Sequence, residues 1–403
     1  MDTGISGRQE RGAALAAMGA VLTMPTPGRF KVRSQSNPNV RYEVNLLHGR
    51  CSCPDANDGW TCKHIYATEI VSTRKDADGA VTVERHTYTQ EWSTYNRAAC
   101  SEKDTFVTLL SDLCGTIEQP SQRMGRPRLP LSDMAFATTF KVYSRFSSRR
   151  FTTDLRDAHA RGLITRMPHF NSVSGYLSKP ELTPILSALI RAAALPLKDI
   201  ESSFAVDASG FSTSRFNRWL DFKHGTTVEA KSRNWVKAHL MVGVKTNIVT
   251  AAEVTAWNKA DSPYLPSLVS DTAENFPMVE ISADKGYMSK ANAQHIESVG
   301  ATPFIPLRSR SANVEQPTGP AAWDRLYHRF MADRDTFMSR YHQRSNVEST
   351  FAMIKAKFGD SVLSKSAIGQ HNEVLCKVLA HNVVVVGQAI QEFGIDARYG
   401  LSA

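Results

Sequence analysis

The spacing of apolar residues changes along the chain and divides it into regions of different predicted structure. Before about residue 75, short stretches of alternating polarity predict two strands over 29–36 and 41–47, after a short amphipathic helix over 12–24. From Ser132 to about Leu197 the apolar residues recur at helical spacing. This region therefore predicts three packed helices, over 132–146, 147–162 and 178–195.

The second half of the chain predicts a sheet. Residues 204–211 form an apolar run typical of a buried strand, and 234–246 with 247–257 predict a hairpin. Helical and extended patterns then alternate: helical over 262–276, extended over 278–287, helical over 289–300, extended over 301–308. Two long helical patterns follow, over 338–358 and 372–390. This order predicts an α/β fold, with a mixed sheet flanked by helices.

Composition narrows the possible classes of protein. The chain has 403 residues, 42% of them apolar, which is enough for a sizeable core. We expect no membrane-spanning segment, because no apolar run reaches the roughly 18 residues that cross a bilayer, and no export signal. Six cysteines are too few for a disulfide framework in a chain of this length. We therefore expect reduced thiols and a cytoplasmic protein.

The charge of the chain is unevenly distributed. The formal net charge is +9, and between Gln122 and Arg166 ten Lys or Arg residues stand against three Asp, a local net charge of +7. Such a concentration of cations predicts a polyanionic partner. The segment begins with Gly125-Arg126-Pro127-Arg128, whose GRPR letters are similar to a minor-groove AT-hook but equally suit a linker that avoids helix.

Three carboxylates lie at notable positions. Asp207 in FAVDASGF and Asp284 in VEISADKGY end apolar strands, although a lone aspartate there more often caps a strand or turn. Glu348 lies in YHQRSNVESTFAMIK, where an α-helix would place three other side chains within the same stripe of about 60°: Tyr341, Arg344 and Lys355. Ionised carboxylates gathered within about 4–5 Å repel by about 3–4 kcal/mol per pair at an effective dielectric of about 20. Such a cluster needs cations, and oxygen ligands favour Mg²⁺ or Mn²⁺.

These stretches together resemble the signature regions of the DDE transposases of bacterial insertion sequences, which have a ribonuclease-H-like core. The last stretch keeps the tyrosine, two-spacer, arginine, three-spacer, glutamate, six-spacer, lysine pattern of that family. The resemblance covers roughly residues 132–391. It implies that Asp207, Asp284 and Glu348 hold two Mg²⁺ or Mn²⁺ ions, with Asp207 shared between them. It also implies that Tyr341, Arg344 and Lys355 contact phosphates of the transposon end.

A second motif lies in CSCPDANDGWTCKHIYA. Cys51, Cys53, Cys62 and His64 offer three thiolates and one imidazole at close spacing, a ligand set that suits tetrahedral Zn²⁺. The motif, its two upstream strands and the following helical stretch resemble a SWIM zinc finger, a module associated with DNA or protein binding. All four coordination positions are filled by protein, so we expect a structural rather than a catalytic metal.

The two resemblances give the expected organisation. We expect a zinc-binding module over residues 1–75, a linker with the GRPR segment over 76–131, a helical DNA-binding region over 132–200 and a ribonuclease-H-like catalytic domain over 201–395. Five arginines and one hairpin lysine are candidate DNA contacts: Arg126, Arg128, Arg145, Arg149, Arg150 and Lys237. The implied partner is double-stranded DNA, both terminal inverted repeats and target, bound by a homodimer or larger assembly.

The expected function is DNA cleavage and strand transfer by two metal ions at the ends of an insertion sequence. Two alternatives stay open from sequence alone: a zinc-dependent DNA-binding regulator with an inactive transposase body, and a related nuclease that cuts without joining. The presence of all three acidic residues argues against an inactive body. The chain has no nucleotide-binding Walker loop, so we expect no requirement for ATP.

Overall fold

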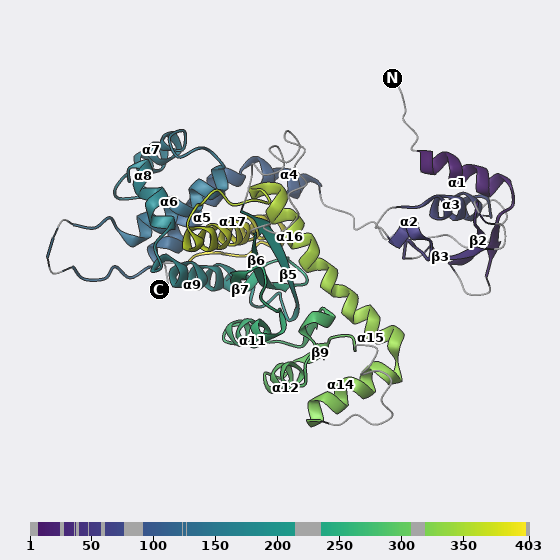
Figure 1. Cartoon of the computed structure of the whole chain (residues 1–403). Coiled ribbons are helices and arrows are strands. Elements are labelled where there is room, and N and C mark those ends of the chain that lie inside the picture. The colour runs from purple at the N-terminus through teal and green to yellow at the C-terminus, as the bar shows by residue number, and fades with distance from the viewer. Residues whose placement is uncertain are drawn as a thin grey trace, which may run out of the picture. The chain divides into compact units, whose positions relative to one another are not determined.

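The computed structural model describes residues 7–24, 28–35, 37, 40–46, 48–57, 61–75, 92–122, 124–125, 127–213, 235–307 and 319–399. Their contacts divide the chain into two compact units, Met1–Gln90 and Glu91–Ala403. Each is described by itself (Figure 1).

The first unit is a small antiparallel sheet packed against helices. Its strand order is β1-β2-β3-β4. Its elements are α1 (Gly7–Ala17), β1 (Val21–Thr23), β2 (Arg29–Arg33), β3 (Arg41–Asn45), β4 (Arg50–Cys51), α2 (Pro54–Asn57) and α3 (Lys63–Lys75). The helix α1 lies so close to α3 that a Cβ on Gly12 would be 2.6 Å from the Cβ of Tyr66. Only glycine therefore fits there.

The stretch 12–24, predicted as one helix, instead contains the end of α1 and all of β1. Gly19 follows the last turn of α1 with φ +64°, the left-handed conformation in which helices commonly end. The chain then reverses into Val21–Thr23, which pairs with β2. The two strands and the helix expected after them are present as β2, β3 and α3.

The second unit begins with helices. They are α4 (Trp92–Cys100), α5 (Glu102–Gly115), α6 (Leu131–Ser144), α7 (Thr152–Ala160), α8 (Phe170–Leu177) and α9 (Leu182–Ala194), followed by the 3₁₀ turn η2 (Leu195–Leu197). Three of them correspond to the predicted helices, namely α6, α7 and α9. The segment 76–131, expected to be a linker, contains α4 and α5. Phe106, Leu109, Leu110 and Leu113 of α5 are buried at helical spacing, a signal that the sequence did carry.

The sheet of the second unit is mixed and has five strands in the order β7-β6-β5-β8-β9. They are β5 (Ser203–Ser212), β6 (Trp235–Gly243), β7 (Val249–Ala256), β8 (Glu280–Ala283) and β9 (Thr302–Phe304). The hairpin β6–β7 and the pair β5–β6 are antiparallel, whereas β8 runs parallel to both β5 and β9. The predicted α/β fold with a mixed sheet is thereby confirmed, and it is consistent with a ribonuclease-H-like core.

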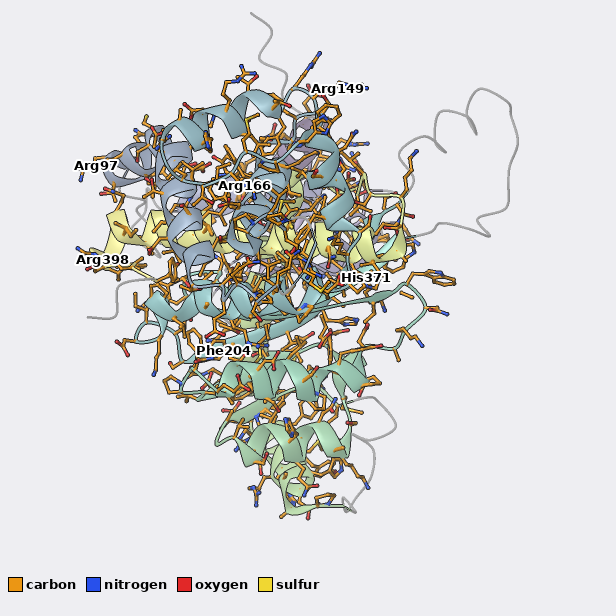
Figure 2. All side chains as sticks on the ribbon, turned by 90° about the vertical axis from the view of Figure 1, so that its left-hand side faces the viewer. Arg97, Arg149, Arg166, Phe204, His371 and Arg398 are labelled. Carbon is orange, nitrogen blue, oxygen red and sulfur yellow. The ribbon has the colours of Figure 1, made fainter. Side chains whose placement is uncertain are left out.

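Helices and 3₁₀ turns follow the strands. They are η3 (Ser262–Tyr264), α11 (Leu265–Ala273), η4 (Lys285–Tyr287), α12 (Lys290–Ser298), α14 (Ala321–Ala332), α15 (Arg334–Tyr341), η5 (His342–Arg344), α16 (Ser345–Phe358) and α17 (Ala367–Phe393). In Figures 1 and 2 the sheet lies between the helices of the first part of this unit and the pair α11 and α12. Phe204, labelled in Figure 2, is buried in the core between them.

The last helix, α17, is the core helix of the second unit. By length and composition alone it could cross a membrane, contrary to the expectation from sequence, but 83% of its most apolar window is buried inside the protein. Asn382 ties it to two neighbours: its side chain accepts from the Val249 amide at 2.9 Å and donates to the Ile190 carbonyl at 3.1 Å. A buried polar side chain with all of these partners is typical of a packed core rather than of a lipid-facing helix.

Candidate functional site

The parallel pairing of β5 and β8 brings two of the predicted carboxylates together. Val206 of β5 pairs with Ala283 of β8, so Asp207 and Asp284 each follow directly after this pair. The prediction that Asp207 ends its strand is wrong, because β5 continues to Ser212 in its pairing with β6 and only the pairing with β8 stops before Asp207. Asp284 also begins η4 as its N-cap residue. A Cβ on Gly286 would lie 3.8 Å from one Asp284 oxygen, so the chain passes this carboxylate closely.

The environment of Asp207 reflects the other two acidic residues. Its side chain is 20% exposed, and one oxygen accepts from the Ala208 amide at 2.8 Å. Burial raises the pKa of Asp207, and the charges of Asp284 and Glu348 raise this pKa further, against the opposing effects of Ala208 and Arg344. The three predicted carboxylates thus lie close enough to influence one another.

Arg344 joins two of these carboxylates. Its guanidinium is in contact with Asp207 and donates to Glu348 at 2.6 Å. Tyr341 reaches the third, because its hydroxyl donates to Asp284 at 3.3 Å. Arg344 also lies 5.7 Å from the centre of the Tyr341 ring. Tyr341 and Arg344 therefore each contact one of the two aspartates, and Glu348 is linked to Asp207 through Arg344.

The sequence predicted one continuous α-helix for the stripe. In the structure the stripe is instead divided between α15, a 3₁₀ turn and α16. Tyr341 ends α15, the 3₁₀ turn η5 (His342–Arg344) follows, and Glu348 lies in the first turn of α16. A 3₁₀ turn has about 3.0 residues per turn instead of about 3.6, so it rotates Tyr341 and Arg344 relative to α16. The contacts of both residues with the acidic triad are made across this turn.

Lys355 lies two helical turns beyond Glu348 on α16. Its ammonium group donates to the Ser209 hydroxyl at 2.6 Å and lies 5.3 Å from the centre of the Phe211 ring. Ser209 is two residues after Asp207, so it lies on the same face of β5. Burial lowers the pKa of Lys355. This face of β5 therefore carries the aspartate at one point and the lysine contact further along.

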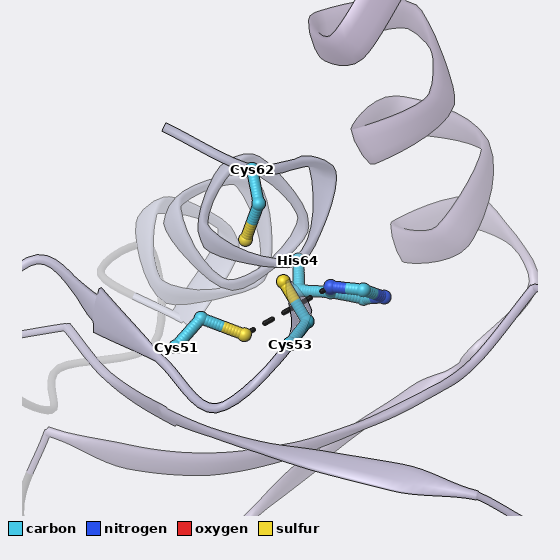
Figure 3. A group of neighbouring side chains, drawn as sticks. All are labelled: Cys51, Cys53, Cys62 and His64. Carbon is cyan, nitrogen blue, oxygen red and sulfur yellow. Dashed lines mark hydrogen bonds between the residues drawn. The ribbon is translucent and has the colours of Figure 1, made fainter. Parts of the chain in front are cut away.

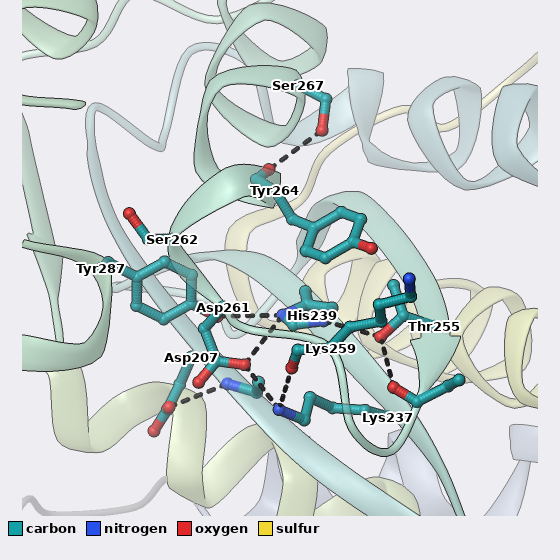
Figure 4. A network of polar contacts seen from close by, with 12 residues as sticks. Asp207, Lys237, His239, Thr255, Lys259, Asp261, Ser262, Tyr264, Ser267 and Tyr287 are labelled. Carbon is teal, nitrogen blue, oxygen red and sulfur yellow. Dashed lines mark hydrogen bonds and ion pairs between the residues drawn. The ribbon is translucent and has the colours of Figure 1, made fainter. Parts of the chain in front are cut away.

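Lys237, predicted on the DNA-facing surface of the hairpin, takes part in a buried network (Figure 4). Its ammonium group donates at 2.8 Å both to Asp261 and to the Lys259 carbonyl, and its side chain is 14% exposed. Its role in DNA binding stays a prediction, and this pairing favours a structural role. The partner, Asp261, lies 24 residues away in sequence and is a residue that the sequence analysis missed.

His239 occupies the centre of the same network. It is fully buried, contacts the Thr255 hydroxyl at 3.0 Å and the Tyr287 hydroxyl at 3.3 Å, and stacks on Tyr264 with ring centres 4.8 Å apart. Burial lowers the pKa of His239 to about 4, with Asp261 opposing the shift. The imidazole is therefore neutral at pH 7, as expected for a histidine that is fully buried.

The predicted DNA-contacting arginines lie in two places. Arg145 ends α6 and donates to the Lys357 carbonyl beyond Glu348 on α16 at 3.5 Å. Arg149 and Arg150 are exposed in the loop before α7, and Figure 2 shows the Arg149 side chain projecting from the surface. Arg128 is also exposed. Arg126 lies outside the described residues, so its predicted contact stays untested.

The Cys/His motif converges in the first unit (Figure 3). The ligand atoms of four buried residues lie within 4.8 Å of one another: Cys51, Cys53, Cys62 and His64. Cys51 comes from the end of β4, Cys62 directly precedes α3, and His64 lies in the first turn of α3. The His64 Nδ1 atom lies 3.9 Å from the Cys51 sulfur, and Tyr42 packs against the imidazole with ring centres 4.8 Å apart.

The donor set of this site fits Zn²⁺. The thiols of Cys51 and Cys62 share a hydrogen bond that lowers the pKa of Cys62 to about 3 and, with burial, raises the pKa of Cys51. One thiolate is thus already favoured by its surroundings, and a bound cation stabilises the rest. Three sulfurs and one imidazole that converge within a buried space match a closed structural zinc site. Across the described ranges no other group of three or more such ligands converges in this way.

The fold and these two sites define the class of the protein: a mixed five-stranded sheet with carboxylates where the pairing of the parallel strands β5 and β8 ends and on a late helix, joined to a small Cys₃His module. Residues 199–383 match the family model described as the transposase DDE domain, and residues 42–71 match that of the SWIM zinc finger. No solved structure matches the chain. The chain therefore carries a transposase DDE domain and an N-terminal SWIM zinc finger, and both predicted resemblances are confirmed.

Proposed function

We propose that this protein is a DNA transposase that cleaves DNA at the ends of an insertion sequence and joins them to a target. The observation that supports the proposal best is the meeting of Asp207, Asp284 and Glu348 around Tyr341 and Arg344. These residues come from two strands and a distant helix. In the described residues the oxygens of the three acids do not form one group at ligand spacing, and Arg344 lies between Asp207 and Glu348, where it supplies the positive charge that neighbouring carboxylates require.

The three carboxylates would supply the oxygen ligands that Mg²⁺ or Mn²⁺ prefers, and the family resemblance implies that Asp207 would bind both ions. Bound ions would activate an attacking water or 3′-hydroxyl and stabilise the leaving oxygen of a phosphodiester. Arg344 holds Asp207 and Glu348 in its guanidinium pairs, so its single positive charge is shared between two acidic charges. Since both acids need free oxygens to bind metal, we expect Arg344 to turn from them towards a DNA phosphate.

The DNA partner follows from the neighbouring groups. Tyr341 and Lys355 carry a hydroxyl and an ammonium group on either side of Glu348, which suits contacts with well-separated phosphates of a strand. We propose terminal inverted repeats and target DNA as the substrates, with a homodimer or larger assembly in the DNA complex. The SWIM module would add DNA or protein contacts, held in shape by Zn²⁺.

The experiment is a nicking and joining assay with the full chain, Mg²⁺ and DNA that carries the terminal inverted repeats. Wild type is compared with Asp207→Asn, Asp284→Asn and Glu348→Gln. We expect each variant to lose at least about 10³-fold of the metal-dependent nicking rate while it still binds the DNA, because each loses a metal ligand.

A matched control is Glu274→Gln, which removes a carboxylate from the C-terminal end of α11. It should nick at the wild-type rate. Nicking by wild type without any joined product would favour a nuclease that only cuts. Metal-independent binding with no nicking by any form of the protein would favour the inactive regulator instead.

A further inference from the structure

A pocket of about 630 Å³ lies in the second unit, away from the acidic triad. It is formed where the end of α6, the helix α8, the end of α16 and the start of α17 meet. Its volume is within the usual range of about 300–1,000 Å³ for ligand sites. The family match starts at residue 199, so the walls from α6 and α8 lie outside it.

The lining is cationic. Four of the lining residues are basic: Lys141, Arg145, Lys365 and Lys377. The acidic residue in the lining is Glu373, and its carboxylate already accepts from the backbone amides of Leu363 and Ser364 at 2.8–3.0 Å. Glu373 thereby holds the loop before α17 and keeps its negative charge, which also acts on Lys141 and Lys377. Four cations against one acid leave the lining with a formal net charge of +3, which attracts an anion.

Lys377 is the most deeply buried of these cations, with 1% of the residue exposed. It donates to the carbonyls of Gly359 at 2.8 Å and Ser361 at 2.7 Å, which leaves one of its three ammonium protons for another acceptor. Burial lowers the pKa of Lys377 to about 8, so it is still mostly protonated at pH 7. Lys365 is exposed at the rim.

Hydroxyl groups and a helix start complete the lining. Ser148 and Ser174 share a hydrogen bond at 3.0 Å, and Ser366 donates to Ser178 at 2.8 Å. Ser366 is also the N-cap of α17, a helix of 27 residues whose positive end therefore faces the pocket. Cations, hydroxyls and a helix N-terminus are the groups that bind phosphate in proteins.

The position of the pocket relative to α16 indicates which kind of phosphate it binds, namely a phosphate of a DNA strand. Glu348 lies in the first turn of α16, and Phe358, the last residue of α16, lines the pocket. Ten residues of α-helix span about 15 Å, which corresponds to about four nucleotides of duplex rise. Lys355 lies between them on the same helix. A DNA strand that ran from the carboxylates along α16 would reach this pocket after that distance.

We propose that this pocket, lined by Lys141, Arg145, Lys365 and Lys377, binds a backbone phosphate of the DNA strand about four nucleotides from the phosphate at the acidic triad. The proposal rests on the proposed function for the position of the reacting phosphate. The ligand chemistry itself, a phosphate diester, follows from the pocket alone.

The test measures binding of duplex DNA with the terminal inverted repeats to the full chain, by fluorescence anisotropy without Mg²⁺ and over a range of salt. The variant is Lys365→Gln, and the matched control is Lys198→Gln, an exposed lysine outside the pocket lining. Loss of one phosphate contact should weaken binding and lower the slope of log affinity against log salt by about 1. The control should leave both unchanged.

A second arm locates the phosphate. DNA in which single phosphates are replaced by neutral methylphosphonates is titrated against wild type and Lys365→Gln. We expect one position, about four nucleotides from the cut site, to weaken binding to wild type and to have no further effect on the variant.

Three results would overturn the proposal. One is an unchanged salt slope in Lys365→Gln. Another is a loss of DNA affinity in Lys198→Gln that equals the loss of DNA affinity in Lys365→Gln. The third is occupation of the pocket by inorganic phosphate, seen as shifted amide signals around Ser364 and Lys365, while DNA binding stays unaffected. Binding is measured without Mg²⁺, so the two proposals can fail separately. A protein that does not nick DNA but shows the expected salt slopes would support the phosphate site and contradict the proposed catalysis.

Discussion

At the scale of single residues, Arg344 has a different role in the structure from the one its position in the motif suggests. The motif implies a phosphate contact, whereas in the DNA-free protein its guanidinium holds Asp207 and Glu348. Both roles follow from one property, because a guanidinium fork pairs equally with carboxylate and phosphate. A bound metal would compete with Arg344 for the acids, and DNA would offer it a replacement partner.

His239 allows a pH prediction at this scale. Its pKa is lowered by burial from 6.5 to about 4. Between these values the unfolded chain takes up a proton that the folded chain does not, so folding stability falls as the pH drops below 6.5 and the loss is complete near pH 4. We expect His239 to contribute a loss of about 2 kcal/mol in the free energy of unfolding between pH 7 and pH 5. Urea denaturation at both values measures it.

The variant His239→Gln keeps a polar side chain but cannot titrate, so it should be less stable at pH 7 yet lose less stability on acidification. His159→Gln changes an exposed histidine of α7 and is the control. An equal pH dependence in wild type and His239→Gln would show that this histidine takes up its proton as readily in the folded protein as in the unfolded chain.

The residues that sequence could and could not predict differ in one physical respect. Asp207 and Asp284 were recognisable because each follows a run of apolar residues, where a charge is costly and therefore informative, although β5 continues beyond Asp207 to Ser212. The partnership of Lys237 with Asp261 was not, because an ion pair between residues 24 positions apart depends on how a hairpin and a later turn pack. Sequence shows which residues carry charge, and packing decides whether that charge is free.

At the scale of elements, the turn η5 shows why a helical stripe is only an approximate guide. The regular repeat correctly grouped Tyr341, Arg344 and Glu348, but the 3₁₀ turn that lets Tyr341 and Arg344 reach different aspartates has no clear sequence signal. The helices α4 and α5 were missed for another reason: they follow a long stretch without periodicity, which made the whole segment resemble a linker.

The zinc site leads to a prediction about the strands and the helix of the first unit. Cys51 on β4 and Cys62 at the start of α3 join the sheet and the helix of a unit whose apolar core is small. Small domains of this kind commonly depend on a metal for folding, and structural Zn²⁺ contributes an apparent binding free energy of about 10–16 kcal/mol in zinc-finger peptides. We expect chelation of Zn²⁺, or Cys62→Ser, to abolish protection of α3 and β2–β4 amides in hydrogen exchange.

Cys100→Ser, which changes an exposed cysteine of the second unit, is the matched control and should retain the zinc and the protection. Protected α3 amides after complete zinc removal, verified by metal analysis, would show that the apolar core of this unit suffices. Protection in α17 should be the same in all forms, since the ligands lie in the other unit.

At the scale of the whole molecule, the division of the chain matters more than any single element. Contacts separate residues 1–90 from residues 91–403, and each unit has its own apolar cluster. The acidic triad, its arginine and tyrosine, and the pocket at the end of α16 all lie in the second unit. The expected boundaries of four domains stay a prediction, although the helices of 132–200 pack into one core with the sheet.

This division predicts that the proposed chemistry survives without the first unit. A chain of residues 91–403 contains every group assigned to cleavage, and α17 packs against α4, α5, α6 and α9 as well as β7, so its core is complete. We expect this chain to fold, to keep the higher of two calorimetric transitions of the full protein, and to nick DNA with Mg²⁺ within about tenfold of the full-length rate at saturating DNA. The zinc-dependent transition should be absent. A single transition in the full protein, lowered throughout by chelation, would contradict this view, because it would mean that the zinc module and the catalytic unit fold as one cooperative body.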